Sequence, residues 1–363
     1  MKQRYLALDA MRGLTLALMI VVNTPGSWAH IYAPLRHAQW HGWTPTDLVF
    51  PFFLFIVGAA LFFSRAAQVQ VPLTHQLLRI AKRAGLLVLI GVLLEYYPFQ
   101  QPLENLRLPG VLQRIGLAYG LAACAQLAWQ PMTARAQMFA NTTLIAVIVV
   151  GYSVLLRTAA EPFSLEGNLV RTLDVALLGA PHLWAGAGVA FDPEGLLSTL
   201  PAVATVLIGY EAARWLRSGQ RFWVLMAGLT GVGLVLTGSA YLWPDPINKS
   251  LWTSSYVLLT GGLGLVCLAS LLLLERWWVG ARLQKPLVVL GENPLFIYIL
   301  AWVWVRSYGL IATEEGTLYQ TVYQWFSGFA SLEAASLMFA LAHLLPLWGL
   351  AWWLHKRKIF IKI

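Results

Sequence analysis

The sequence has very little charge. Asp, Glu, Lys and Arg make up 11% of the 363 residues, whereas soluble globular proteins carry about 25%. Hydrophobic residues make up 58% of the chain, and its mean hydropathy is +0.65. So few charges cannot solvate the surface of a water-soluble protein of this length. The composition therefore excludes a soluble protein and indicates an integral membrane protein with several spans.

Acidic residues and cysteines are both scarce. The chain has 16 Asp and Glu against 25 Lys and Arg, which gives a net charge of +9. The basic residues are scattered over short connections and form no single patch, so we expect no nucleic-acid partner. The two cysteines, Cys124 and Cys267, both lie inside apolar runs. They imply neither a disulfide framework nor a thiolate metal site, and we expect no metal.

Several motifs of soluble enzymes are also missing. The chain has no Walker A motif, no GxGxxG after a strand and no HExxH, which argues against an ATPase, a Rossmann enzyme and a zincin. Basic residues precede the first apolar run, as in a signal peptide, but no small-residue cleavage site follows it. We therefore expect a first helix that is retained in the protein.

Ten apolar windows are long enough to span a membrane as helices. They fall at residues 6–23, 46–64, 80–97, 109–128, 137–156, 195–213, 222–242, 252–273, 286–306 and 334–354. Glu95 and Glu292 interrupt the third and the ninth of these windows. No internal repeat and no low-complexity linker divides the chain. We therefore predict an all-α polytopic membrane protein of about ten transmembrane helices, with one domain over residues 1–363.

Lysine and arginine are distributed unequally between the two sets of connections. With a cytoplasmic N-terminus, 17 of the 25 basic residues fall on the cytoplasmic side, 6 on the other side and 2 within helices. The six outer residues are Arg36, Arg107, Arg157, Arg171, Lys249 and Arg306. Because basic connections stay in the cytoplasm, both termini are predicted to be cytoplasmic, and the long connections 157–194 and 307–333 to be extracytoplasmic.

Residues 23–51 differ from the apolar runs on either side because they carry many polar groups. Among them are three histidines, His30, His37 and His41. Ionisable groups at membrane depth usually mark a functional site, and an imidazole can take a proton from an attacking amine or hydroxyl near neutral pH. Each histidine could instead cap or hydrogen-bond a loop, and their spacing does not choose between them.

Asp47 and Asn23 lie near the two ends of this stretch. Asp47 opens the second window, where it could fix the tautomer of a histidine. Alternatively, Thr46 or Asp47 is the N-cap of the helix. Asn23 ends the first window, where its amide could stabilise an oxyanion or could simply end the helix before a Pro-Gly turn. The residues alone leave these alternatives open.

A cytoplasmic set of basic residues could hold a phosphate-bearing cofactor. The set comprises Arg79, Lys82, Arg83, Lys356, Arg357, Lys358 and Lys362. The alternative is that these residues set the topology and contact anionic lipid headgroups. In the first window, Arg12 follows Asp9 by three residues on the same helix face, which predicts an internal salt bridge.

Polar residues next to the later windows are further candidates. Arg107 and Arg114 flank the start of the fourth window and either bind an anion or tether Glu95 or Glu104. Acidic residues before the sixth window could suit its helix dipole or receive an amine or sugar hydroxyls. Lys249 precedes the eighth window on the outer side.

The ninth window carries Glu292 just before Pro294, and an intramembrane Glu next to a helix break usually lines a cavity. His343, part-way along the tenth window, has the same status.

Six blocks of the sequence resemble one known family. They are LDAMRGLTLALMIVVN, LRHAQWHGWTPTDLVFPFFLFIVG, RLPGVLQRIG, DPEGLLSTLPA, INKSLWTSSY and KRKIFIKI, and they occur in the family's order. The family is that of the heparan-α-glucosaminide N-acetyltransferases, and the chain resembles most their bacterial relatives of the NagX type. Six blocks in order, from the first window to the last residue, make the resemblance specific.

The resemblance implies a transmembrane acyltransferase fold. It also implies an enzyme that takes acetyl-CoA from the cytosol and acetylates the amine of a terminal glucosamine across the membrane. The family's active histidine lies in an HAxW block, here His37 to Trp40, which singles out His37. The family's catalytic asparagine matches Asn23, and the aspartate of its DLVFP block matches Asp47.

The residues and the resemblance together predict an acetyltransferase of the bacterial inner membrane. Arg83 and Lys362 match basic residues that bind the coenzyme in the family. The coenzyme set that we expect is Arg12, Arg79, Arg83, Arg114, Lys358 and Lys362. The acceptor set that we expect is Trp40, Asp192, Glu194, Lys249 and Glu292. His37 would deprotonate the acceptor, Asn23 would stabilise the oxyanion, and Asp47 would orient the imidazole or the acceptor.

Two alternative functions follow from the same features. Polar residues beside broken helices are also how transporters bind substrate, which suggests an amino-sugar permease. An O-acyltransferase of cell-surface glycans would share the mechanism and differ in its acceptor. The expected partners are acetyl-CoA, an amino-sugar acceptor and the lipid bilayer. A homodimer is compatible with the family, although no residue pattern indicates it.

Overall fold

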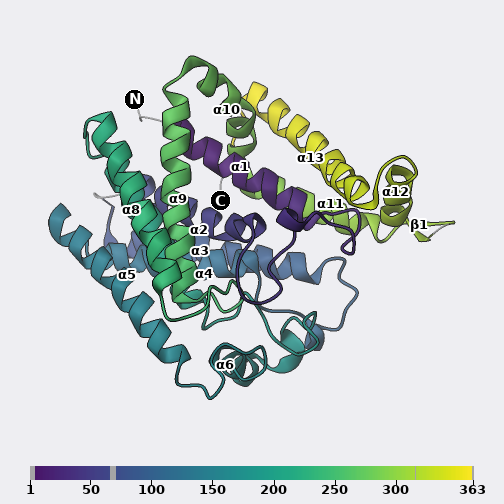
Figure 1. Ribbon diagram of the computed structural model, residues 1–363, viewed down its shortest axis with the longest axis horizontal. Coiled ribbons are helices and arrows are strands. Elements are labelled where there is room, and N and C mark those ends of the chain that lie inside the picture. Colours follow the sequence, from purple (N-terminus) through teal and green to yellow (C-terminus); the bar gives the residue numbers. More distant parts are fainter. Residues whose placement is uncertain (1–4, 66–70, 315, 362–363) are drawn as a thin grey trace. The chain divides into compact units, whose positions relative to one another are not determined.

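The computed structural model describes residues 5–65, 71–314 and 316–361, and this part of the chain is almost entirely helical (Figure 1). Its α-helices are α1 (Leu6–Asn23), α2 (Val49–Arg65), α3 (Leu73–Tyr96), α4 (Val111–Ala128), α5 (Ala134–Leu156), α6 (Leu169–Leu178), α7 (Thr199–Leu216), α8 (Phe222–Leu242), α9 (Ser254–Glu275), α10 (Trp278–Gly291), α11 (Pro294–Tyr308), α12 (Leu318–Ser327) and α13 (Leu332–Arg357). Short 3-10 turns are η1 (Ala33–Leu35), η2 (Pro45–Leu48), η3 (Leu103–Asn105) and η4 (Ala180–His182). Strands β1 (Ala312–Thr313) and β2 (Gly316–Thr317) pair antiparallel.

Nine of the ten predicted windows each coincide with one helix, or with η2 and α2 in succession. The ninth, residues 286–306, is wrong as a single helix, because the chain breaks between α10 and α11 and bends by 67°. Pro294 begins α11. A proline disfavours the helical conformation of the residue before it, and Asn293 accordingly has φ −126 and ψ 52.

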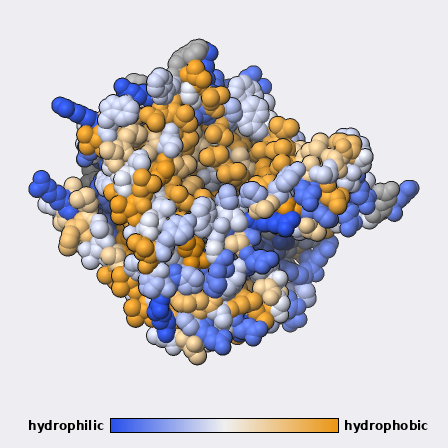
Figure 2. Space-filling view, in the orientation of Figure 1, coloured by the Kyte–Doolittle hydropathy of each residue, from blue (hydrophilic) through white to orange (hydrophobic). Residues whose placement is uncertain are grey.

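The helices confirm a polytopic membrane protein. In the described ranges, seven helices are long and apolar enough to cross a membrane, and the bent pair α10–α11 makes an eighth if it forms one span. Helices α3 and α7 match predicted windows but are less apolar, so by this measure the count falls below the predicted ten. Apolar side chains cover much of the helical surface seen in Figure 2.

The contacts group the chain into two compact units. The first comprises Met1–Ala38, Thr44–Phe50 and Ser270–Ile363, and the second comprises Gln39–Trp43 and Pro51–Ala269. Helices α2 and α9 therefore begin in one unit and continue in the other. The single domain over the whole chain stays a prediction.

In the first unit, α1 packs against α10 and α13 (Figure 1). Two glycines let α1 and α10 approach with their backbones in contact. A Cβ added at Gly13 would lie 1.7 Å from the carbonyl oxygen of Leu287, and one at Gly291 would lie 2.2 Å from that of Asp9. Any side chain at either position would push the two helices apart.

In the second unit, α3 packs on α4, and α7 packs between α4 and α5. Most of α7 is buried, because it packs against both α4 and α5. The connection 157–194, predicted as an extracytoplasmic loop, contains the helix α6, whose N-cap Asn168 accepts a hydrogen bond from the Arg171 N–H at 2.8 Å. This connection packs on a core of Tyr152, Leu156, Val170, Phe191 and Leu251.

Candidate active site

The first unit pairs His37 with Asp47. The imidazole Nδ1 lies 2.7 Å from Asp47 Oδ1, and the carboxyl side chain is 1% exposed while the histidine side chain is 42% exposed. Asp47 also accepts hydrogen bonds from backbone N–H groups, so it acts as a carboxylate that accepts the Nδ1 proton too. The pair thus fixes the tautomer with Nε2 as the basic ring nitrogen. Of the three histidines that spacing left equal, the structure gives this partner to His37.

The geometry around Asp47 explains how the chain brings these two residues together. Oδ2 accepts hydrogen bonds from the backbone N–H of Ala38 at 3.1 Å and of Thr44 at 3.0 Å. Thr44 is the N-cap of η2, and Asp47 is its third residue, so the two form a capping box. The N-cap is therefore neither Thr46 nor Asp47. Asp47 both caps the turn and holds the histidine.

Asn23 is the last residue of α1 and is exposed. Among the described residues, the Asn23 amide has no hydrogen-bond partner, so no hydrogen bond from this side chain ends α1. The following residue, Thr24, instead bonds back to the Ile20 carbonyl at 2.8 Å. The Asn23 amide is thus available to a ligand.

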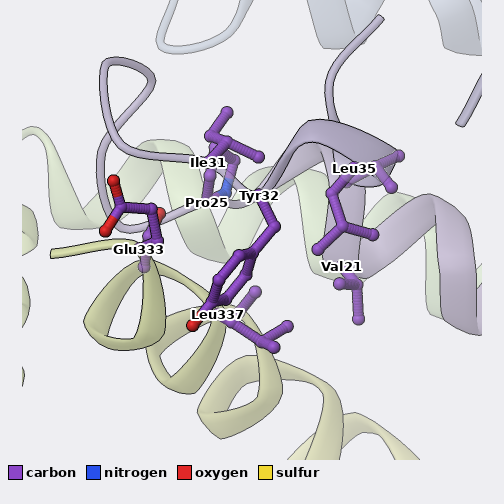
Figure 3. A pocket seen from close by; sticks show the side chains of 10 residues that line it. Val21, Pro25, Ile31, Tyr32, Leu35, Glu333 and Leu337 are labelled. Atoms are coloured by element: carbon purple, nitrogen blue, oxygen red, sulfur yellow. The ribbon is translucent and has the colours of Figure 1, made fainter. Parts of the chain in front are cut away.

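A small hollow lies beside this segment, between the end of α1 and the start of α13 (Figure 3). Tyr32 extends over α13 towards Leu337, with Val21 and Leu35 on one side and Glu333 on the other. The free volume of the hollow is about 10 Å³, enough for about one water molecule. The hollow is therefore no binding pocket for a sugar or a coenzyme.

Trp40 and His41 belong to the second unit. The Trp40 indole N–H donates to the Phe163 carbonyl at 2.7 Å, and its ring meets Phe191 edge-on at 5.5 Å. Burial lowers the pKa of the His41 imidazole, whose Nδ1 lies 3.4 Å from the amide nitrogen of Asn248. The indole therefore anchors this segment on the connection 157–194 through a bond that uses its only donor.

Arg107 gathers three acidic side chains in the second unit. It pairs with Asp192 through two hydrogen bonds of 2.8 Å, with Glu194 at 2.7 Å and with Glu95 at 3.5 Å. Burial alone would lower the pKa of Arg107, but the Asp192 hydrogen bond and the three carboxylate charges raise it. Of the alternatives left open for Arg107, the structure shows the tether to Glu95. The bidentate bond to Asp192 could not be predicted from the sequence.

The two acidic residues of this cluster have different environments. Asp192 is fully buried, and its oxygens also accept the backbone N–H groups of Trp184 at 3.1 Å and Glu194 at 3.0 Å. The Glu194 side chain is 13% exposed and uses one oxygen for Arg107. Asp192 therefore has a structural role here, whereas Glu194 keeps an oxygen that could meet a ligand.

Arg114 is buried near this cluster in the same unit. It donates to the Ser198 hydroxyl and, at 3.2 Å, to the Gly195 carbonyl, and it lies over the Trp252 ring at 4.9 Å. Asp174 supports the same turn by accepting the Leu196 N–H at 2.9 Å, and burial raises its pKa to about 6. These contacts hold the segment that begins α7.

A family model provides an independent comparison. The model described as "Heparan-alpha-glucosaminide N-acetyltransferase, catalytic" matches residues 4–243, which is more than half of the chain and includes His37, Asp47 and the Arg107 cluster. The chain belongs to this N-acetyltransferase family. The expectation drawn from the six sequence blocks is thereby confirmed.

Two mammalian proteins of that name are similar to this family member. The human heparan-alpha-glucosaminide N-acetyltransferase is 27% identical over 356 residues, covering 82% of this chain and 52% of its own length. The mouse protein is 28% identical over 360 residues, covering 82% of this chain and 53% of its own. This chain thus spans about half the length of the curated relatives that it matches.

The predicted coenzyme residues of this N-acetyltransferase family member have unequal surroundings. Arg79 and Lys358 are exposed, and Arg83 is half-buried with its guanidinium 4.9 Å over the Tyr119 ring. Arg12 makes the predicted salt bridge to Asp9 at 2.9 Å and also donates to the Gly291 carbonyl at 3.3 Å. Lys362 lies outside the described residues.

Two acceptor candidates remain, Glu292 in the first unit and Lys249 in the second. Glu292 pairs with His355 at 2.8 Å in the first unit. Lys249 is half-buried in the second unit, where its carbonyl accepts the Trp252 N–H at 3.0 Å. Their roles in acceptor binding stay predictions.

His343 Nδ1–H donates to the Phe339 carbonyl at 2.8 Å, and its ring is flanked by aromatic rings, which agrees with a structural role.

Sequence reasoning missed several residues that organise the site. Thr44 could have been found, because Thr-x-x-Asp before an apolar run is a capping signature. Asp174 and Asn293 gave no such signal. Their partners lie 22 and 66 or more positions away in the chain, so only the folded structure reveals them.

Gly195 offers a test of the turn beside Arg107 and Arg114. A Cβ at this position would lie 1.7 Å from Asp174 Oδ2, so Gly195→Ala is expected to destabilise the protein by about 1–3 kcal/mol or more. Adding Asp174→Ala removes the colliding carboxyl group and should restore part of that loss. Thermal unfolding of both single variants and the double variant in detergent measures this coupling. Gly151→Ala, with no atom within 4 Å of its Cβ, is the control; strictly additive losses would contradict the collision.

Proposed function

We propose that this protein transfers the acetyl group of cytoplasmic acetyl-CoA to the amine of glucosamine, or of a glucosamine-ended saccharide, on the extracytoplasmic side of the bacterial inner membrane. The observation that carries the proposal is the His37–Asp47 pair, which lies inside the residues matched to the catalytic family model. The curated relatives are named as heparan-alpha-glucosaminide N-acetyltransferases, and their names supply the reaction class.

His37 acts as general base in this proposal. Asp47 accepts the Nδ1 proton at 2.7 Å, which leaves the basic lone pair on Nε2, on the opposite side of the ring. As the acceptor nitrogen attacks the thioester carbonyl, its proton passes to Nε2. The C–S bond then breaks, and the thiolate of coenzyme A takes up a proton. Asp47 stabilises the imidazolium that forms in between.

Asn23 and Glu194 have supporting roles in the same proposal. The Asn23 amide is exposed at the end of α1 and would donate to the oxyanion. Glu194 would receive the neutral amine or a hydroxyl of the acceptor, because one of its oxygens is not engaged by Arg107. Trp40, Asp192 and Lys249 would then shape the acceptor site.

A groove on the second unit is suited to the coenzyme. It has a volume of about 680 Å³ and is formed by the start of α3 and the end of α4, including Gln76 and Cys124. Ligand pockets have volumes of about 300–1,000 Å³. Arg79 and Arg83 follow Gln76 by three and seven residues, so they continue the same helix face. We propose that these two, with Lys358 and Lys362, bind the phosphates. Arg12 and Arg114 already have partners in the protein.

Transfer of label tests the proposed reaction. Detergent-purified protein is incubated with acetyl-CoA labelled in its acetyl group, with and without glucosamine, and the product is resolved by chromatography. Labelled N-acetylglucosamine that requires the protein is expected. Coenzyme binding without transfer to glucosamine, or to a glucosamine-ended saccharide, would contradict the acceptor and point to an O-acyltransferase.

Cys124 reports on the proposed coenzyme groove. It is exposed and lines the groove, whereas Cys267 is less exposed and lies outside it. We expect a maleimide to modify Cys124, and coenzyme A at saturating concentration to slow that modification at least about tenfold. The rate at Cys267 is the internal control. Equal rates with and without coenzyme A at both cysteines would contradict this location.

An amino-sugar permease is the second candidate, because the bent pair α10–α11 is a discontinuous helix of the kind found at transporter substrate sites. A permease needs no coenzyme. Protein that moves labelled N-acetylglucosamine into vesicles but binds no coenzyme A would favour it over the acetyltransferase.

A further inference from the structure

The last described residues of the chain are held by one buried side chain. The amide of Asn293, which is 1% exposed, donates to the Ile359 carbonyl at 3.1 Å and accepts the Ile361 N–H at 2.7 Å. The Asn293 amide thus offers one donor and one acceptor to a single segment, as a residue of a neighbouring β-strand would. The segment Lys358–Ile361, here called the tail, is therefore fixed to the break between α10 and α11.

The break itself is held firmly by three elements of the first unit. Arg12 of α1 donates to the Gly291 carbonyl at 3.3 Å, and His355 of α13 pairs with Glu292 at 2.8 Å. Asn293 then binds the tail. Each residue of the break thus contacts a different element, and the close packing of Gly291 on α1 leaves no room for it to shift.

The tail has little else to hold it in place. Ile359, Phe360 and Ile361 are 39%, 46% and 44% exposed, so burial of their side chains holds the tail only in part. Lys358 turns the chain out of α13 with φ 55, and the Ile359 N–H returns to the Leu354 carbonyl at 3.0 Å. Beyond that helix-ending motif, the Asn293 amide supplies the hydrogen bonds that order the chain.

From this geometry we infer that Asn293 is a positioning residue, which holds the tail where Lys358 meets the phosphates of acetyl-CoA and from which the chain continues to Lys362. The inference rests on the proposed function. Lys358 is exposed at the start of the tail, and Lys362 directly follows Ile361 in the sequence. A long cationic side chain binds an anion more strongly when its backbone is already ordered, because less freedom is lost on binding. Asn293 is 1% exposed and its side chain bonds to the tail, so in this inference it acts through the tail.

Hydrogen exchange tests the two hydrogen bonds between Asn293 and the tail without reference to any activity. In the wild-type protein the C-terminal peptide should show protection at the Ile361 amide, and Asn293→Ala should abolish it. Because a buried substitution can impair folding, Ile361→Pro provides a second variant, which removes the same N–H from an exposed position. Phe360→Pro is its control, since the Phe360 N–H has no hydrogen-bond partner among residues 316–361 or elsewhere in the described chain.

Kinetics and binding then test the role of the tail. Asn293→Ala and Ile361→Pro are each expected to raise the KM for acetyl-CoA and the Kd of coenzyme A about tenfold, the loss expected for about one phosphate contact, with kcat within about twofold. Removing residues 358–363 should do the same. In that shortened protein Asn293→Ala should have no further effect. Gln284→Ala, which removes another buried amide of α10, should leave coenzyme affinity unchanged.

The outcomes separate this inference from the proposed function. Lost protection with unchanged coenzyme affinity would overturn the positioning role and leave the acetyltransferase intact. Effects of Asn293→Ala and of the deletion that multiply would also overturn it, because they would act independently. Wild-type protein that binds no coenzyme A would overturn both the proposed function and the role of the tail. This holds even if hydrogen exchange shows the bonds between Asn293 and the tail.

Discussion

Replacing His37 by alanine is expected to lower the rate of acetyl transfer to glucosamine by about a thousandfold. The substitution removes the basic nitrogen that Asp47 orients, and general-base catalysis contributes about 10²–10⁴-fold to such reactions. The side chain is 42% exposed, and Asp47 keeps its bonds to the Ala38 and Thr44 N–H groups, so the fold should be retained. The affinity for coenzyme A should also be retained, because His37 is assigned to the acceptor step.

The measurement is kcat at saturating acetyl-CoA and glucosamine, together with equilibrium binding of coenzyme A. His30→Ala is the matched control, since His30 lies in the same polar stretch and its side chain forms no bond to a carboxylate in the described structure. It should keep its rate within about threefold. A His37→Ala protein with wild-type turnover would remove His37 from the chemistry.

Replacing Asp47 by asparagine is expected to have the second largest effect, a fall in kcat of about 10²–10⁴-fold. The backbone N–H groups of Ala38 and Thr44 require an acceptor at Oδ2, so the new NH₂ group must occupy the Oδ1 position, facing His37. There it donates to Nδ1 and places the proton on Nε2, where it blocks acceptance of the acceptor's proton. The capping acceptor survives, so thermal stability should change little.

Thr44→Ala separates catalysis from capping. It removes the N-cap of η2 but leaves both Asp47 oxygens in place, so it should cost about 1 kcal/mol of stability and keep most of the rate. Thermal unfolding and kcat are measured on both variants. If Asp47→Asn lost stability and activity in the same proportion as Thr44→Ala, the aspartate would be a cap only.

The sequence predicted the helices well where hydrophobicity alone decides them. Membrane-length apolar runs have one stable conformation in lipid, because every backbone polar group must be paired within the segment. The ninth window failed at Glu292–Asn293, where Pro294 breaks the ladder and the Arg12 side chain binds the Gly291 carbonyl. The apolar content of a window shows where a helix is possible, but it does not detect that a residue before a proline avoids the helical conformation.

Candidate site residues could be predicted from the sequence, but most of the contacts between them could not. Asp9 and Arg12 could be paired from the sequence because helix geometry fixes neighbours three residues apart. His37 and Asp47 are ten positions apart in irregular chain, so spacing could not choose among three histidines. The family resemblance singled out His37, and the capped turn η2 shows why it meets the carboxylate.

Contacts over long sequence separations could not be predicted at all. Arg107 reaches Asp192 over 85 positions and Asn293 reaches Ile361 over 68. Charge patterns show that a buried arginine requires partners, but they do not identify which acidic residue lies next to it in the folded protein. The same limit applied to Asp192 and Glu194, which looked alike in sequence and differ in burial and in the number of bonds that they accept.

The most direct test of acetyl transfer across a membrane uses reconstituted vesicles. Purified protein is placed in liposomes that contain trapped glucosamine, and labelled acetyl-CoA, which does not cross the bilayer, is added outside. Molecules with their cytoplasmic face outward should then produce labelled N-acetylglucosamine inside the vesicles, and His37→Ala should not. Labelled product that forms only when both substrates are on the same side of the membrane would contradict the account.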